Sequence, residues 1–263
     1  MSPVFEDLLK IVGRYRGSGR LNRIVLTTNG CAEGLSKHLD SLANAITHIN
    51  ISRHAADDYM NARIFKTEEV PSATELKCLI SELNKRGLPV NLNCVYSTVH
   101  VFGRKYYHAS QNILKAEAME FISFAKGVGA SSVVFRLDHR ENALDQGIEL
   151  EEAFADYKTV HQAKCDSCRV IGKFICGLSI NFKRSVYEPV KFHPENELYE
   201  LVLHSDAVLY KDWSRHHPLE RPLPQTLPTA DWELLITKVD RNQTNPAKEC
   251  DEQQKTCTLM TVR

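Results

Sequence analysis

Short apolar runs alternate with helical patterns from residue 1 to about residue 163, and this alternation most constrains the fold of the chain. Four runs have the length and β-branched content of buried strands: 24–28, 47–52, 89–95 and 130–136. Amphipathic helical patterns surround them at 3–16, 33–45, 72–87, 112–126 and 149–163. Strands separated by helices form crossover units, so we expect an α/β fold with a parallel sheet and helices outside it.

The pattern changes after residue 164. A cysteine-bearing turn, "CDSCRVIGKFICG", precedes an expected strand, "LSINFKRSVYEP", and "LYELVLHSDAVLYKDW" resembles two strands joined by a turn. We therefore expect an α/β region at 1–145 and a helix with a small β-rich, cysteine-containing appendage at 146–213. The segment 214–263 is expected to be a proline-rich, weakly ordered tail.

Composition limits the cellular setting and the partners. The 263 residues carry a formal net charge of +0, so no overall field attracts nucleic acid or an anionic membrane. No run approaches the roughly 18 apolar residues of a membrane span, and Glu6 and Asp7 stand where a signal peptide is basic. We expect a cytoplasmic protein without a membrane partner, whose eight cysteines are thiols or metal ligands.

Polar residues end each expected strand of the first half. Because the carboxyl ends of parallel strands meet at one edge, these side chains are predicted to converge there, at the edge where open parallel sheets bind ligands. Such a ring suits an amino-acid or nucleoside ligand. The alternative is that individual residues only cap the following helices. The predicted set is Thr27, Thr28, Asn29, Ser52, Arg53, Asn91, Asn93 and Arg136.

A second candidate site lies in "CDSCRVIGKFIC". Cys165 and Cys168 form a CxxC turn that presents two thiols to one metal, and Cys176 is a candidate third ligand at a hairpin return. The candidates for a fourth ligand are His193, His204 and Cys31. Zinc and an iron–sulfur cluster both fit such ligands, and ordinary thiols are the alternative to any metal.

The order "LTTNG", helix, "INISRH", helix, "VNLNCV", helix, "VVFR" resembles the later strands of radical S-adenosylmethionine enzymes, and "SPVFEDLLKIV" is similar to the helix after their second strand. The resemblance covers roughly residues 1–140 and implies a partial parallel (βα) barrel. It makes Thr28, Asn29, Ser52, Asn91, Asn93 and Arg136 the set that binds S-adenosylmethionine. In that set, Asn91, Asn93 and Arg136 would approach the ribose or the methionine carboxylate.

Two motifs of that family are missing. Its members hold a [4Fe-4S] cluster on CxxxCxxC, and a "GGE" stretch meets the amino group of S-adenosylmethionine; the chain contains neither. The resemblance thus implies the later part of a radical enzyme that binds S-adenosylmethionine and a small-molecule or nucleotide substrate but is inactive alone. Its cluster ligands would come from a separately encoded N-terminal half. The alternative is a non-catalytic binding or partner subunit that retains the barrel, with a structural zinc site.

The first helix and strand give a further expectation. If two preceding strands are missing, the helix at 3–16 and the strand at 24–28 leave an apolar edge uncovered. Its expected members are Leu8, Leu9, Val12, Ile24 and Leu26. Burial of this edge would require association with the missing partner or with a second copy of the chain.

Overall fold

The architecture is a mixed α/β fold built on one eight-stranded sheet. The computed structural model describes residues 5–19, 23–96, 100–101, 104–105, 110–137, 150–165, 168–185, 202–203, 209–210 and 257–262. The strand order is β12-β1-β2-β3-β6-β9-β8-β7. The strands are β1 (Ile24–Thr28), β2 (His48–Ser52), β3 (Val90–Tyr96), β6 (Ser132–Leu137), β7 (Thr159–Cys165), β8 (Cys168–Ile175), β9 (Leu178–Ser185) and β12 (Cys257–Val262).

The sheet is mostly parallel. Every neighbouring pair from β12 to β9 is parallel, whereas β8 is antiparallel to both β9 and β7. This arrangement agrees with the expected α/β class and is compatible with a partial α/β barrel. Two short antiparallel pairs lie outside the main sheet: β4 (His100–Val101) with β5 (Arg104–Lys105), and β10 (Val202–Leu203) with β11 (Leu209–Tyr210).

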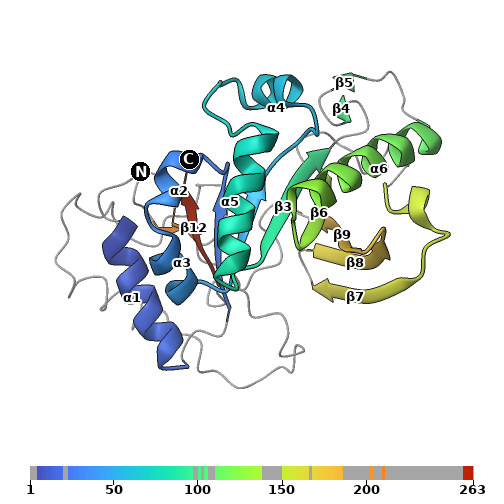
Figure 1. Ribbon diagram of the computed structural model, residues 1–263. Helices are drawn as coiled ribbons and strands as arrows, with labels where there is room; N and C mark the ends of the chain where they lie inside the picture. Colours follow the sequence, from blue (N-terminus) through green and yellow to red (C-terminus); the bar gives the residue numbers. More distant parts are fainter. Residues whose placement is uncertain are drawn as a thin grey trace.

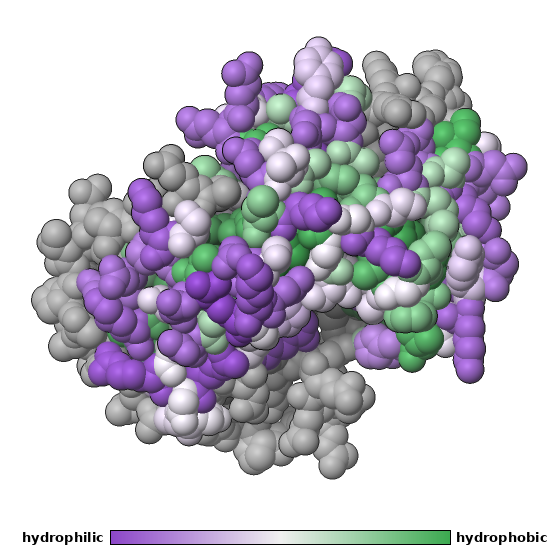
Figure 2. Space-filling view, viewed as in Figure 1, coloured by the Kyte–Doolittle hydropathy of each residue, from purple (hydrophilic) through white to green (hydrophobic). Residues whose placement is uncertain are grey.

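The helices gather on one side of the sheet, where α1, α3, α5 and α6 cover the strands (Figure 1). The described helices are α1 (Phe5–Gly17), α2 (Ala32–Ser36), α3 (Leu39–Ala45), α4 (Asp58–Phe65), α5 (Ala73–Lys85), α6 (Gln111–Val128) and the 3₁₀ turn η2 (Glu152–Phe154). Figure 2 shows this side in space-filling form, with many hydrophilic residues on its surface. Among the described helices, none is long and apolar enough to cross a membrane.

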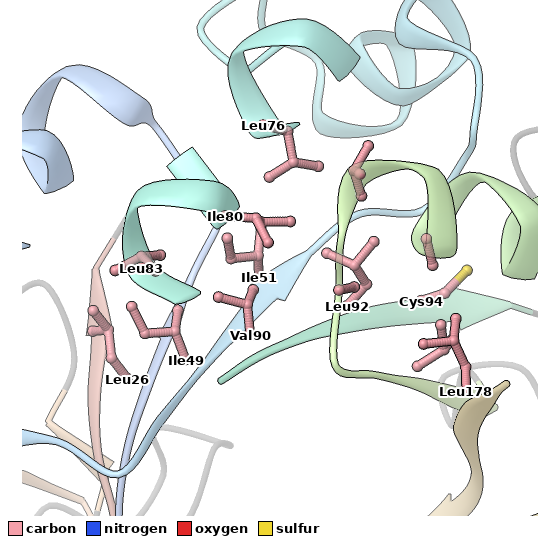
Figure 3. Close-up of a cluster of buried hydrophobic side chains, with 14 of the residues drawn as sticks. Leu26, Ile49, Ile51, Leu76, Ile80, Leu83, Val90, Leu92, Cys94 and Leu178 are labelled. Atoms are coloured by element: carbon pink, nitrogen blue, oxygen red, sulfur yellow. The ribbon is translucent and has the colours of Figure 1, made fainter. Parts of the chain in front are cut away.

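Strand alternation explains the packing of α5 on the sheet. Ile49 and Ile51 of β2, with Val90 and Leu92 of β3, point toward the helices and are almost completely buried. Figure 3 shows them beneath three α5 residues that recur at helical spacing: Leu76, Ile80 and Leu83. These contacts form part of one continuous hydrophobic core on the helix side.

The start of α5 confirms a sequence prediction. Ser72 Oγ accepts a hydrogen bond from the Glu75 backbone N–H at 3.3 Å, and the Ser72 backbone N–H donates to a Glu75 carboxylate oxygen at 2.8 Å. The capping box satisfies two backbone donors at the helix N-terminus. The same bonds to Ser72 hold the pKa of Glu75 below its ordinary value.

Two helix predictions need correction. The expected helix at 149–163 is wrong: η2 is followed by β7, whose residues from Thr159 onward pair with β8. Cross-strand hydrogen bonds therefore outweigh the helix preference of the preceding glutamates. The expected helix at 33–45 is divided into α2 and α3, with His38 in a non-helical conformation between them.

The strands of the expected β-rich appendage are joined to the main sheet. β9 pairs in parallel with β6 from Ser132↔Ser179 to Arg136↔Lys183, and β8 and β7 continue outward from β9. The cysteine-bearing hairpin therefore extends the main sheet. The expected pair of strands within 198–213 is found in short form as β10 and β11.

The uncovered apolar edge predicted at the N-terminal end is not present. Leu8, Leu9, Val12, Ile24 and Leu26 are all at most 2% exposed, because α1 packs on the core and β12 pairs in parallel with β1. A strand from the chain's own C-terminal region thus occupies the position expected for a partner. Within the expected weakly ordered tail, 257–262 forms this strand, and the remainder of 214–263 lies outside the described residues.

Candidate ligand site on the polar face of the sheet

The side of the sheet opposite the helices is lined by polar side chains, and we call it the polar face. Residues two apart on a strand share a face, and register partners on adjacent strands share it as well. Parallel strands covered on both sides are usually apolar on both, so this composition is unusual. The polar members of this face include Thr27, Asn50, Ser52, Asn91, Asn93, Ser132, Arg136, Ser179, Asn181 and Lys183, and Val25, Val95 and Val134 have the same strand parity.

A chain of hydrogen bonds crosses three strands at the centre of the polar face. Ser132 Oγ donates to Asn91 Oδ1 at 2.6 Å, and Asn91 Nδ2 donates to Asn50 Oδ1 at 3.0 Å. All donors point from β6 toward β2, so the orientation of both amide groups is fixed. This row provides a rigid polar floor, two residues along the strands from Asn93.

Asn93 carries an unsatisfied polar atom. The residue is 6% exposed, and its side-chain Oδ1 has no hydrogen-bond partner within the described part of the chain. An unpaired buried acceptor costs about 1–3 kcal/mol. Most such groups in folded proteins are paired, which makes Asn93 a candidate contact for an N–H or O–H group of a ligand.

Two basic residues lie at the carboxyl edge of the same face. Arg136 of β6 and Lys183 of β9 are direct register partners, and both are half-buried. Arg136 is also paired with Val95, which is two residues beyond Asn93 on β3. No ion pair involving Arg136 occurs among the residues that the structure describes.

Four of the six predicted cofactor-binding residues lie on the polar face, and the other two, Thr28 and Asn29, do not. Ser52, Asn91, Asn93 and Arg136 lie on it. Thr28 is in register with the core residue Ile51 on the helix side, where its Oγ1 accepts a hydrogen bond from the Gly30 backbone N–H at 3.2 Å. The prediction that Thr28 joins the converging set is therefore wrong, because it has the opposite strand parity.

Asn29 and Arg53 have local structural roles. Asn29 Oδ1 accepts a hydrogen bond from the Cys31 backbone N–H at 3.2 Å and so stabilises the turn after β1. Arg53 is 1% exposed, with its guanidinium 4.8 Å from the centre of the Phe124 ring on α6. The inclusion of Arg53 in the converging set is wrong for the same reason of parity.

Sequence reasoning missed five polar members of this face: Asn50, Ser132, Ser179, Asn181 and Lys183. A signal for most of them is present as polar residues at every second position in "HINIS" and "SINFK", whereas Val134 interrupts this alternation in "SVVFR". At position 172 an added Cβ would lie 3.2 Å from Asn181 Oδ1 and 3.1 Å from the His161 Cβ, so a larger residue there would require these side chains to shift. This proximity agrees with the pairing of Gly172 with Asn181 in the sheet.

The three predicted metal-binding cysteines do not meet. Cys165 and Cys168 are register partners at the end of the β7–β8 hairpin, whereas Cys176 follows the opposite end of β8. Eight strand residues at about 3.3 Å each separate Cys176 from the pair by roughly 25 Å. Cys176 is therefore wrong as a third ligand. Of the expected fourth ligands, Cys31 is exposed after β1, and His193 and His204 lie outside the described residues.

Across the described ranges, no group of three or more His, Cys, Asp or Glu side chains is placed to hold a metal ion. Cys94 is also unsuited to metal binding or nucleophilic chemistry. It is completely buried, and burial raises the pKa of its thiol well above the ordinary value.

His48, at the start of β2, should make the stability of the fold depend on pH. Burial, followed by the positive charge of Arg23, lowers the pKa of His48 to about 4 from its ordinary value of 6.5. Between these values the unfolded chain binds a proton that the folded chain excludes, so stability is lost as pH falls. With solvent screening, we expect roughly 1–2 kcal/mol from this source.

Urea unfolding of the wild type and His48→Gln at about pH 7.5 and pH 4.5 measures this contribution. The variant should lose less stability than the wild type over this interval, because carboxylates titrate equally in both proteins. Equal losses would show that His48 is not responsible.

Comparisons with known proteins assign no family to the chain. No family model matches it, and no curated protein matches it. Among solved structures, one named "Putative alpha Amylase from Salmonella typhimurium" aligns with 13% identity over 43% of this chain, with a TM-score of 0.33. The alignment covers 26% of that protein, so the chain spans about a quarter of its length.

Proposed function

We propose that the polar face binds a small polar ligand in the manner of a radical S-adenosylmethionine enzyme, with the cluster-bearing segment supplied by another chain. The observation that carries the proposal is the hydrogen-bonded row from Ser132 to Asn50, beside the buried and unpaired Asn93 oxygen. A fixed amide row and an unsatisfied acceptor are the groups expected in a preformed site for a hydrogen-bonding ligand.

The polar residues have distinct roles in this proposal. Asn93 accepts a hydrogen bond from the ligand, and Asn91 keeps its orientation because Ser132 and Asn50 engage both ends of its amide. Arg136 has a planar guanidinium that matches the two oxygens of a carboxylate. Ser52 supplies a half-buried hydroxyl in register with Asn93.

These donor and acceptor groups fit S-adenosylmethionine, which carries a carboxylate, a ribose and an adenine. In the radical enzymes, S-adenosylmethionine bound to a reduced cluster supplies a 5′-deoxyadenosyl radical. The described residues do not fit the [4Fe-4S] cluster itself, since they bring no three cysteines together. The chain is therefore proposed to bind and orient the small molecules, and the cluster to come from a cytoplasmic partner.

A second candidate is a binding or partner subunit that retains the fold without catalysis. The roughly 25 Å between Cys176 and the Cys165–Cys168 pair favours it, because these three cysteines then do not form an auxiliary site. Formation of 5′-deoxyadenosine in the presence of a cluster-bearing partner would distinguish the enzyme from this alternative.

The first test is titration calorimetry with S-adenosylmethionine. The wild type should bind it without forming 5′-deoxyadenosine, and Asn93→Leu should weaken binding at least tenfold. Because Asn93→Leu removes a buried unpaired oxygen, the variant should be no less stable than the wild type. Asn44→Leu, on the exposed side of α3, is the matched control and should bind normally. Equal affinity in all three proteins would exclude the polar face as the site.

The second test concerns Cys165 and Cys168, which stay a predicted pair of metal ligands in need of two more. Elemental analysis should find zinc or iron in the wild type and less in Cys168→Ser, whereas Cys78→Ser, at an exposed position on α5, should retain it. Structural zinc sites contribute on the order of 10 kcal/mol of binding energy, so loss of metal should also lower the midpoint of thermal unfolding. Absence of metal from the wild type would leave these cysteines as ordinary thiols.

A further inference from the structure

We propose that Phe174 and Asn181 form a subsite, at the β8 end of the polar face, for a nucleobase that carries an amino group beside a ring nitrogen, as adenine does. The inference rests on the proposed function only in taking the polar face as a ligand site. It adds the chemical class of a second ligand, a nucleoside or nucleotide substrate, which the binding of S-adenosylmethionine leaves open.

The first observation is an aromatic ring that lies open on this face. Phe174 of β8 is 61% exposed and is in register with Ser179 of β9. Ser179 is in register with Ser132, which continues the row through Asn91 to Asn50. Phe174 therefore ends the same register row that forms the hydrogen-bonded floor of the polar face. Its ring surface is available for stacking with a planar ligand.

The second observation is a carboxamide beside this ring. Asn181 is half-buried, and its side chain makes no hydrogen bond to any residue that the structure describes. It lies two residues beyond Ser179, the register partner of Phe174, so Asn181 and Phe174 are diagonal neighbours. Diagonal neighbours on adjacent strands are roughly 7–8 Å apart. One planar ring can therefore stack on Phe174 and present its edge to Asn181.

Gly172 brings the carboxamide to this position. Gly172 is the register partner of Asn181, and Asn181 Oδ1 lies 3.2 Å from the place that a Cβ on Gly172 would take. The carboxamide thus extends over β8, two residues along that strand from Phe174. A glycine within a strand often marks a place where another group approaches the backbone closely. The exposed His161 of β7 borders the other side of Gly172.

The chemistry of these two side chains selects a nucleobase. The Asn181 carboxamide offers a donor at Nδ2 and an acceptor at Oδ1. Together they match a base edge with a ring-nitrogen acceptor beside an exocyclic amine, such as N7 and N6 of adenine. Stacking of the base on Phe174 requires no charge. A purely apolar ligand would leave the amide unpaired, and a sugar would not cover the aromatic ring.

The subsite lies apart from the residues proposed to bind S-adenosylmethionine. Those residues are on β2, β3 and β6, whereas Phe174 is on β8. In the strand order β3-β6-β9-β8, three strand spacings separate Asn93 from Phe174. At about 4.8 Å per spacing, the distance across the sheet is roughly 14 Å. The base is therefore assigned to a substrate held beside S-adenosylmethionine.

Titration of adenosine into the full chain, followed by saturation-transfer NMR, tests the inference. We expect saturable binding that weakens about fivefold or more in Phe174→Leu and in Asn181→Ala. Phe174→Tyr keeps the ring and should bind adenosine as the wild type does. Inosine has a carbonyl oxygen in place of the amine, so the wild type should bind it more weakly than adenosine. This preference should disappear in Asn181→Ala.

Two matched variants control for the loss of an exposed ring or amide elsewhere. Tyr59→Leu on α4 and Asn44→Ala on α3 should bind adenosine normally. Because Phe174 is exposed, Phe174→Leu should keep the wild-type midpoint of thermal unfolding, which separates loss of the ring from loss of folding.

The inference is overturned if the wild type shows no saturable adenosine binding, if Phe174→Leu and Asn181→Ala bind adenosine normally, or if inosine binds as tightly as adenosine. Competition between S-adenosylmethionine and adenosine would overturn the assignment of the base to a substrate. Adenosine binding that depends on Phe174, without any binding of S-adenosylmethionine, would remove the proposed function and keep this subsite. Binding of S-adenosylmethionine alone would remove only the subsite.

Discussion

Replacing Arg53 with methionine should destabilise the fold by about 3 kcal/mol or more, because three carbonyls lose their donor and each buried acceptor left unpaired costs about 1–3 kcal/mol. Arg53 donates from Nε to the Ala55 carbonyl at 2.7 Å, from Nη1 to the Pro71 carbonyl at 2.9 Å, and from Nη2 to the Ala56 carbonyl at 2.8 Å. Nη2 also forms an ion pair with Asp58 at 2.5 Å. Methionine fills a similar volume but leaves these acceptors without their donor.

Urea unfolding of Arg53→Met, with Arg53→Lys and Arg63→Met for comparison, measures this effect. Lysine keeps the charge but loses the fork, so its loss should be intermediate. Arg63 is exposed on α4, and its replacement should change stability by less than about 0.5 kcal/mol. A loss below 1 kcal/mol in Arg53→Met would mean that the loop from β2 to α5 does not depend on this guanidinium.

Removal of β12 should have an effect of similar size. A chain that ends at residue 256 lacks the strand that pairs with β1 at Ile24, Leu26, Thr27 and Thr28. The lost backbone pairing corresponds to about 2–6 kcal/mol at 0.5–1.5 kcal/mol per hydrogen bond. The unpaired β1 edge then becomes a template for another chain, so the truncated protein should also associate.

Light scattering and thermal unfolding of the truncated chain, beside a chain that ends at Val262, test this prediction. The longer chain retains every residue of β12 and should behave as the wild type does. An unchanged mass and an unchanged unfolding midpoint in the chain ending at residue 256 would show that β12 does not protect β1.

Local signals predicted the central strands and helices well. The run "IVLTT" predicted the bounds of β1 to the residue, and the helical pattern at 72–87 predicted the start of α5, because both depend on neighbours in sequence. The pairing of β9 with β6 and of β12 with β1 depends on residues far apart, which leave no local pattern. For that reason the sequence predicted a separate appendage and an unprotected edge.

The candidate site was predicted in part for a related reason. Asn91, Asn93 and Arg136 were recognised from their position near strand ends, and strand parity places them on one face. Thr28 and Arg53 are also near strand ends, but their positions have the opposite strand parity and face the helix side. Lys183 was missed because its strand was assigned to another part of the fold, although "SINFK" alternates like the other strands.

The pairing of β1 with β12 also bears on how the chain folds as it is synthesised. About 230 residues separate the two strands, so this contact has a very large sequence separation and raises the contact order of the fold. At about 5–20 residues per second, a ribosome needs roughly 10–50 s to progress from β1 to β12. Throughout that interval the hydrogen-bonding groups on the outer edge of β1 have no partner within the nascent chain. Chaperone binding and slow translation of the C-terminal third should therefore influence the yield of folded protein more than changes in the strength of the early core.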